Sequence, residues 1–160
     1  MLLWLGCTLD EPRDSAAPPG GDTDTEIVGC NDENEECAPG ACAGSGSTML
    51  PGSDCLACHS AASSYDISTL TAAGTVFADY DGHAPLRGAT VRITDADGQI
   101  VELSTNSAGN FYTSQPLSFP IQAEVEARDD IVRMARQAES GACNDCHRCQ
   151  GAASGKLAWP

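Results

Sequence analysis

Apolar and polar residues alternate in several short segments between residues 74 and 136. The alternation is clearest over residues 89–94 and 121–127, where every second residue is Ala, Val or Ile. A period of two is typical of a strand with one buried face. Shorter runs continue the set at residues 75–78, 100–105 and 111–113. The pattern predicts a mainly β fold, a small β-sandwich.

Two polar, glycine-containing segments separate the predicted strands. Residues 95–98 read Asp-Ala-Asp-Gly and residues 106–110 read Asn-Ser-Ala-Gly-Asn. Both are predicted turns, because Gly tolerates positive φ and Asp caps its own backbone. A calcium loop is the alternative for residues 95–98, but no glutamate follows at the EF-hand spacing. Residues 130–136 could form a closing strand or a short helix.

The flanking segments differ in composition from the predicted sandwich. Gly, Pro, Ser, Asp and Glu dominate residues 8–51, which predicts a flexible acidic tether. The predicted organisation is a lipoprotein signal remnant (1–7), the tether with a cysteine patch (8–51), a first cysteine-pair segment (52–73), the β-sandwich (74–136) and a second cysteine-pair segment (137–160).

Part of the predicted sandwich resembles a known family. Residues 88–91 with Asp97 and Gly98, followed by residues 105–111, resemble the carboxypeptidase regulatory-like domain. That family is a small transthyretin-like β-sandwich, and the similarity covers roughly residues 74–127. The resemblance implies a structural or interaction module without a catalytic centre, and a fold of this kind does not define a function.

The chain is strongly acidic. It has 23 acidic and 8 basic residues and a net charge of −15, which disfavours nucleic acid as a partner. Charge-driven adsorption to anionic lipid is disfavoured for the same reason. The acidity either keeps the protein soluble or attracts a basic redox partner.

Two copies of a Cys-x-x-Cys-His motif carry the clearest chemistry. One spans residues 55–59 and the other residues 143–147. Two thiols three positions apart can add to the two vinyl groups of one porphyrin, and the adjacent histidine then binds the iron. The predicted haem-attachment residues are Cys55, Cys58, Cys143 and Cys146, and the predicted iron ligands are His59 and His147. The cofactor is therefore predicted to be haem c, in two copies.

Other interpretations of the paired cysteines remain open. Each pair could form a disulfide, or the two pairs could share one zinc ion. Cys149 extends the second motif toward an iron–sulfur spacing, but no fourth nearby cysteine supports that pattern. Neither disulfides nor zinc would require a histidine after both pairs.

Candidates for the sixth iron ligand are few. His83 is the only histidine outside the motifs, so at most one haem could be bis-histidine. Met49 and Met134 are the thioether candidates. For His83 and Met49 the alternative is an ordinary loop residue, and for Met134 it is a core residue.

The remaining cysteines suggest export. Cys7 follows an apolar run and a glycine, which resembles the lipobox of bacterial lipoproteins and implies acylation of Cys7, although no basic segment precedes it. Cysteine-rich chains are typical of oxidising compartments. The disulfide candidates are Cys30, Cys37, Cys42 and Cys149. We expect an exported protein of the periplasm or of the outer-membrane or cell surface, contacting the membrane only through a lipid anchor.

The two motifs on either side of a sandwich resemble small dihaem c-type cytochrome-like bacterial lipoproteins. The sequence favours a non-enzymatic, extracytoplasmic electron-transfer protein with redox partner proteins, some of them basic. The alternative is a disulfide-stapled cell-surface interaction module without haem. A third possibility is haem catalysis at an open sixth position.

Overall fold

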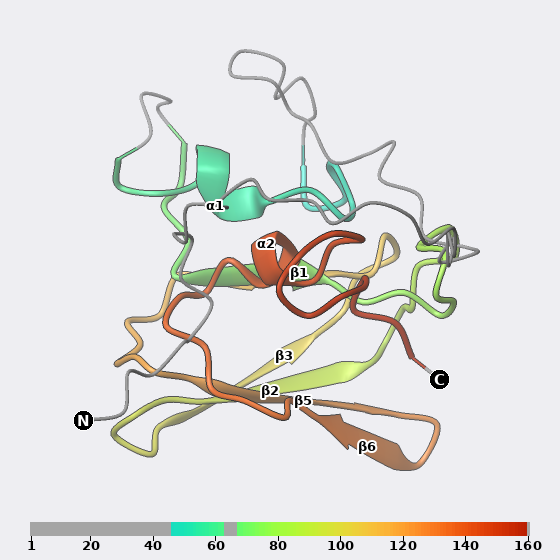
Figure 1. Cartoon of the computed structure of the whole chain (residues 1–160). Coiled ribbons are helices and arrows are strands. Elements are labelled where there is room, and N and C mark those ends of the chain that lie inside the picture. Colours follow the sequence, from blue (N-terminus) through green and yellow to red (C-terminus); the bar gives the residue numbers. More distant parts are fainter. Residues whose placement is uncertain (1–45, 63–66, 160) are drawn as a thin grey trace, which may run out of the picture.

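The computed structural model describes residues 46–62 and 67–159. The fold is mainly β, with two antiparallel sheets that form a small β-sandwich (Figure 1). The elements in chain order are α1 (Cys55–Cys58), β1 (Ala72–Thr75), β2 (Thr90–Thr94), β3 (Ile100–Ser104), β4 (Asn110–Thr113), β5 (Gln122–Ala127), β6 (Asp130–Arg133) and α2 (Cys143–Cys146). The predicted fold class is confirmed.

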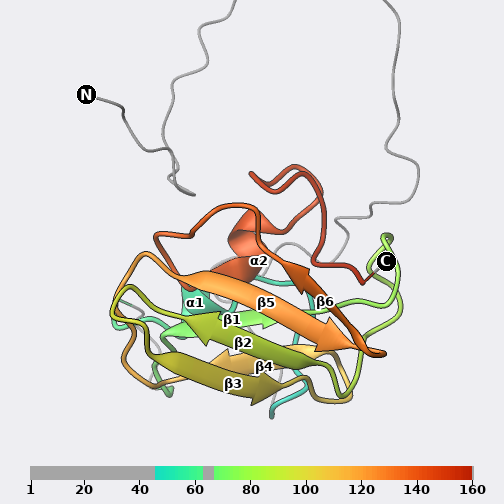
Figure 2. The same cartoon turned by 90° about the horizontal axis from the view of Figure 1, so that it is seen from below.

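The larger sheet has the strand order β3-β2-β5-β6 and faces the viewer in Figure 2. Its central strand β2 alternates as the sequence predicted, with Val91 and Ile93 buried. Arg92 lies on the opposite face and pairs with Glu102 of β3 at 2.8 Å and Glu126 of β5 at 2.5 Å. One face of this sheet therefore supplies the core and the other is polar.

The smaller sheet pairs β1 with β4. All four residues of β1 are buried, because neighbouring segments cover it. At the edge of β1 that does not pair with β4, Ala73 forms a parallel bridge with Ala142, just before α2. The two short helices thus lie on the side of the molecule that carries the small sheet (Figure 1).

The core lies between the two sheets. Its largest fully buried side chains are Ile93, Ile121, Val76, Val91 and Thr75. Phe111 of β4 and Trp159 near the C-terminus are also buried, at 3% and 5% exposure. Trp159 donates its backbone N–H to the Phe77 carbonyl at 2.8 Å. The C-terminal segment is therefore part of the sandwich rather than an appendage to it.

Both predicted turns are present. The Asp95 carboxylate accepts the N–H groups of Asp97 and Gln99, and Gly98 has φ +82°. The Asn106 side chain in the second turn accepts the N–H of Ala108 at 2.9 Å. In the turns these side-chain oxygens accept backbone N–H groups, which within the sheets bond to a neighbouring strand.

Of the two alternatives for residues 130–136, the structure shows the strand. Residues 130–133 form β6, because they continue the sheet beside β5. The end of the predicted tether also packs on the sandwich, where the Asn110 amide donates to the Met49 carbonyl at 2.9 Å. The rest of the tether and Cys7, Cys30, Cys37 and Cys42 lie outside the described residues. Within the described part of the chain, no helix has the length and apolar character to cross a bilayer.

Candidate functional site

Each Cys-x-x-Cys-His motif folds as a single helical turn that ends at its histidine. In α1 the N–H of His59 donates to the Cys55 carbonyl at 2.8 Å, and in α2 the N–H of His147 donates to the Cys143 carbonyl at 2.9 Å. Residues three apart in a helical turn lie on the same face. Each motif therefore presents its two sulfurs on one side, with the histidine next to them.

The first cysteine of each motif has the same local environment. The Cys55 thiol lies 3.6 Å from the Ser53 carbonyl, and the Cys143 thiol lies 3.5 Å from the Gly141 carbonyl. The main difference is at the N-cap, where the Asp54 carboxylate accepts the Leu56 N–H in α1 and Ala142 provides no side-chain cap in α2. The two motifs are thus near-repeats of one local structure.

The two motifs meet in the fold rather than lying on opposite sides of it. The Asn144 side chain, inside the second motif, donates to the carbonyl of Ser53 at 2.8 Å and accepts the backbone N–H of Thr75 at 3.0 Å. Asn144 is only 3% exposed. The two motifs flank the sandwich in the sequence, but in the fold α1 and α2 both pack beside β1.

A buried polar network extends from Asn144 through the small sheet. The Thr75 hydroxyl donates to the Asn110 side chain at 2.7 Å and accepts the Gly52 N–H at 2.9 Å. The Asn110 side-chain amide in turn donates to the Met49 carbonyl. Sequence reasoning missed this network, because each member is an ordinary strand or turn residue until the fold brings them together.

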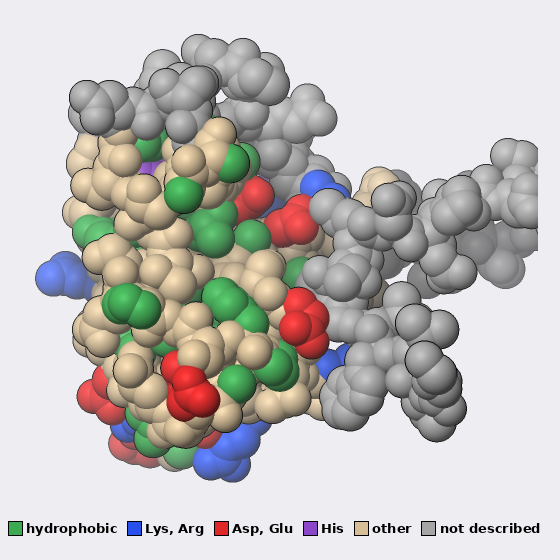
Figure 3. All heavy atoms as spheres, turned by 90° about the vertical axis from the view of Figure 1, so that its left-hand side faces the viewer, with side chains coloured by type: hydrophobic (Ala, Val, Ile, Leu, Met, Phe, Trp, Pro, Cys, Tyr) green, Lys and Arg blue, Asp and Glu red, His purple; other side chains and the backbone are tan. Residues whose placement is uncertain are grey.

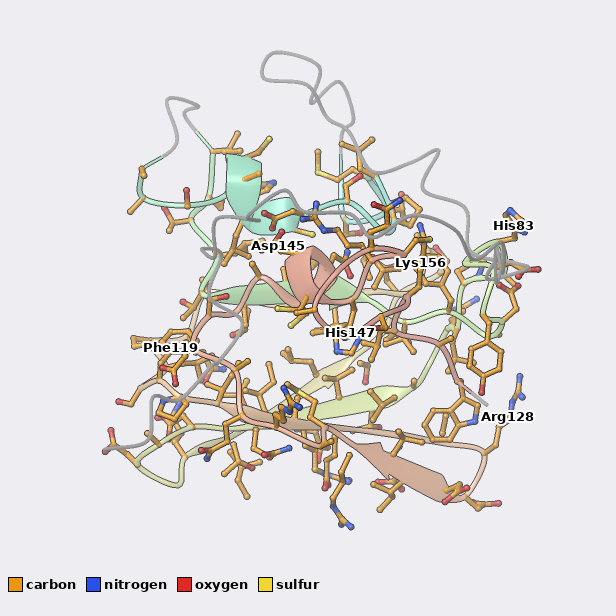
Figure 4. The ribbon with its side chains drawn as sticks, in the orientation of Figure 1. His83, Phe119, Arg128, Asp145, His147 and Lys156 are labelled. Atoms are coloured by element: carbon orange, nitrogen blue, oxygen red, sulfur yellow. The ribbon has the colours of Figure 1, made fainter. Side chains whose placement is uncertain are left out.

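The second motif borders an apolar cavity of about 430 Å³, which we call the second-motif cavity. It is lined by Cys143, Cys146 and His147 on the α2 side, and by residues of β2, β5 and the segment after β6, including Val125 and Met134. Figure 4 shows His147 between α2 and the larger sheet. Arg133 and Arg136 also line it.

The first motif borders a separate apolar cavity of about 290 Å³, the first-motif cavity. Cys55, Cys58 and His59 line it together with Met49 and Phe111. The second-motif cavity falls within the roughly 300–1,000 Å³ of small-molecule and cofactor sites, and the first-motif cavity lies just below that range.

Backbone groups hold both motif histidines. Nδ1 of His59 lies 2.8 Å from the Ser68 carbonyl, so the tautomer that donates this bond leaves Nε2 with a free lone pair. Burial lowers the pKa of His147, and a backbone hydrogen bond with Gly155 partly opposes that shift. A neutral, oriented imidazole is the form that binds a metal.

The cysteines are not all in the state that haem attachment requires. Cys55 and Cys143 are free thiols, whereas Cys58, Cys146 and Cys149 are disulfide-bonded. Burial raises the pKa of Cys55 to about 11 and that of Cys143 to about 12. Cys58 and Cys146 could add to a vinyl group only after their disulfides are reduced, and their thioether role stays a prediction.

The remaining predicted site residues are divided between the cavities and the surface. Met49 and Met134 each line one cavity. His83 is exposed in a loop, where its backbone N–H donates to the Asp79 carboxylate at 3.0 Å, and Figure 4 places it far from His147. Among residues 46–62 and 67–159, no cluster of three or more His, Cys, Asp or Glu side chains is arranged to hold a metal ion.

The surface shown in Figure 3 carries small groups of hydrophobic side chains with acidic side chains between them.

Comparisons of this chain with family models, with curated proteins and with solved structures gave no match. The site must therefore be interpreted from its own geometry.

Proposed function

We propose that this protein binds two c-type haems covalently and transfers electrons outside the cytoplasm. The observation that carries the proposal is that each Cys-x-x-Cys-His motif, folded as one helical turn, borders its own apolar cavity. Two sulfurs, a backbone-oriented imidazole and a cofactor-sized apolar cavity are the parts that a haem c site requires. A chance pair of disulfide motifs would need neither the histidines nor the cavities.

The lining of the second-motif cavity supports a haem more than a neutral apolar ligand. Arg136 lines this cavity together with Arg133, which also pairs with Glu124 at 2.7 Å, in a chain with 8 basic residues. Haem is an apolar ring with two carboxylates, and guanidinium groups are favourable partners for carboxylates. When bound, the haem would supply one-electron redox chemistry, and the protein would supply attachment, iron ligands and an apolar environment.

Attachment requires all four motif sulfurs as thiols. Each S–H adds across one vinyl C=C bond, so that a C–S bond forms and the hydrogen passes to the neighbouring carbon. The addition is redox-neutral. A dithiol reductant must first deliver two electrons and two protons to each disulfide that involves Cys58 or Cys146.

The mass of the mature protein tests the proposal. The full chain produced in a host that matures c-type cytochromes should carry the mass of two haems and a covalent haem absorption band. The double variant Cys55→Ala/Cys58→Ala should lose one haem, and Cys143→Ala/Cys146→Ala should lose the other. The control His83→Ala should keep both, because His83 lies at neither motif. Natively produced protein without covalent haem would refute the proposal.

One observation favours a second function. Cys58, Cys146 and Cys149 are disulfide-bonded, as expected of a disulfide-stapled cell-surface interaction module. In that case the sandwich would present a binding surface, and haem would be absent. The same mass spectrum distinguishes the two functions, because disulfides only remove hydrogens whereas each haem adds its own mass.

A further inference from the structure

The sixth position of each iron is the part of the proposed site that sequence reasoning left open. The described residues contain two methionines, Met49 and Met134. Met49 lines the first-motif cavity and Met134 lines the second-motif cavity. Each cavity thus contains one motif histidine and one methionine.

We propose that Met49 is the distal ligand of the haem bound at His59, and Met134 that of the haem bound at His147. This inference rests on the proposed function and assigns both irons the same histidine–methionine ligation.

Met134 lines its cavity from the larger sheet. It directly follows β6, and its backbone is fixed to β5, since its N–H donates to the Ala123 carbonyl at 3.0 Å and its carbonyl accepts the Gln122 side-chain amide at 2.6 Å. His147 lines the same cavity, and Figure 4 shows His147 between α2 and the larger sheet. Met134 therefore lines the cavity from a backbone fixed to β5, whereas His147 lines it from the end of α2.

Met49 is fixed by the buried polar network. Its carbonyl accepts the Asn110 amide at 2.9 Å, and its N–H donates to the Gly46 carbonyl at 3.3 Å. Its side chain is half-buried. A backbone held in this way positions a flexible thioether beside a cavity without filling it rigidly.

The competing ligands are weaker candidates. His83 is exposed and lines neither cavity. Tyr112 lines the first-motif cavity but is 46% exposed. Among the residues that the structure describes, the lining of the second-motif cavity includes no tyrosine and no second histidine. Apart from the motif cysteines and histidines, methionine is the side chain common to both cavities that ligates haem iron in known proteins.

The test uses full-length protein from a cytochrome-maturing host, with the haem count checked by mass before any spectrum is interpreted. The ferric protein should show the weak long-wavelength charge-transfer band of an iron(III)–thioether bond. Ferrous wild type should bind little carbon monoxide. Met49→Leu and Met134→Leu, which nearly preserve side-chain volume, should each halve the band, bind one carbon monoxide per protein and lower one of the two reduction potentials. The double variant should bind two.

Matched controls separate ligation from packing. His83→Ala should leave the band, the carbon monoxide stoichiometry and both potentials unchanged, and Tyr112→Phe should keep the band and the carbon monoxide stoichiometry. Met134→His should restore a six-coordinate iron that excludes carbon monoxide while keeping the lowered potential.

The experiment distinguishes failure of the ligand assignment from failure of the proposed function. Protein with two haems whose band and potentials are the same in the leucine variants would overturn the ligand assignment alone. Loss of the band in Tyr112→Phe or His83→Ala would also overturn it. Protein without covalent haem would overturn both this assignment and the proposed function.

Discussion

The side-chain amide of Asn144 donates a hydrogen bond of 2.8 Å to the backbone carbonyl of Ser53. A residue inside the second motif thereby holds the segment that leads into the first. The bond is buried, so neither group can exchange its partner for water. It joins two motifs that are far apart in the sequence into one structural unit.

Asn144→Ala should destabilise the protein by about 1–3 kcal/mol, because it removes the acceptor of the buried Thr75 N–H and one hydrogen bond to the Ser53 carbonyl. Urea unfolding measures the change. Asp145→Ala is the matched control in the same helical turn, where the partly exposed pair with Arg148 at 3.6 Å should contribute less than about 1 kcal/mol. Equal losses in the two variants would contradict the role of Asn144.

Gly74 allows β1 to pack tightly against the second motif. A Cβ at this position would lie 2.7 Å from Cζ of Phe111 and 2.8 Å from Cβ of Cys143. Gly74→Ala should therefore lower the free energy of unfolding by about 1–3 kcal/mol through overpacking. The loss should be smaller in a Phe111→Leu background, because one of the two clashes is then relieved. An additive double-mutant cycle would argue against this contact.

Cys149→Ser should remove one disulfide near the second motif, since Cys149 is disulfide-bonded and 9% exposed. The loss of a disulfide from a small domain is expected to cost about 2–5 kcal/mol. The control is the same comparison in a dithiol reductant, where wild type and variant should have nearly equal stability. A free Cys149 thiol in peptides mapped without reduction would contradict the assignment of a disulfide to Cys149.

Stability should fall in acid partly through Asp95. Backbone N–H groups, that of Ser118 first, lower the pKa of this carboxyl below its ordinary value of 3.8. A lowered folded-state pKa means that the contribution is complete above the ordinary value and is lost as the pH falls through the folded-state pKa. Asp95→Asn keeps an acceptor oxygen but does not titrate. The melting temperature of the Asp95→Asn variant should depend less steeply on pH below about 4 than that of wild type. Parallel curves of melting temperature against pH would show that Asp95 does not contribute to the loss of stability in acid.

Because the two motifs lie close together, we expect that reduction of one proposed haem changes the reduction potential of the other. Reduction of one iron removes a positive charge near the other, which makes the second reduction less favourable. A redox titration of wild type should therefore be broader than the sum of the curves from the two single-haem variants, Cys55→Ala/Cys58→Ala and Cys143→Ala/Cys146→Ala. Curves that sum without deviation would place the haems too far apart to interact.

The local features of the fold could be predicted from the sequence because they depend on near neighbours. Alternation in residues 89–94 identified β2, and the Asp and Gly of residues 95–98 identified the turn that follows it. Residues 130–136 were ambiguous, because a short apolar run suits both a strand and a helix. Pairing with β5 made residues 130–133 a strand.

The candidate site divides in the same way. The spacing of Cys55, Cys58 and His59, and its repeat at residues 143–147, lies within one helical turn, so the sequence by itself determined each motif. Only the tertiary structure decided that the motifs meet, that each borders a separate cavity and that Met134 lines one of them. Those relationships depend on contacts such as that between Asn144 and Ser53, which form only when the sandwich brings distant segments together, and no local pattern encodes them.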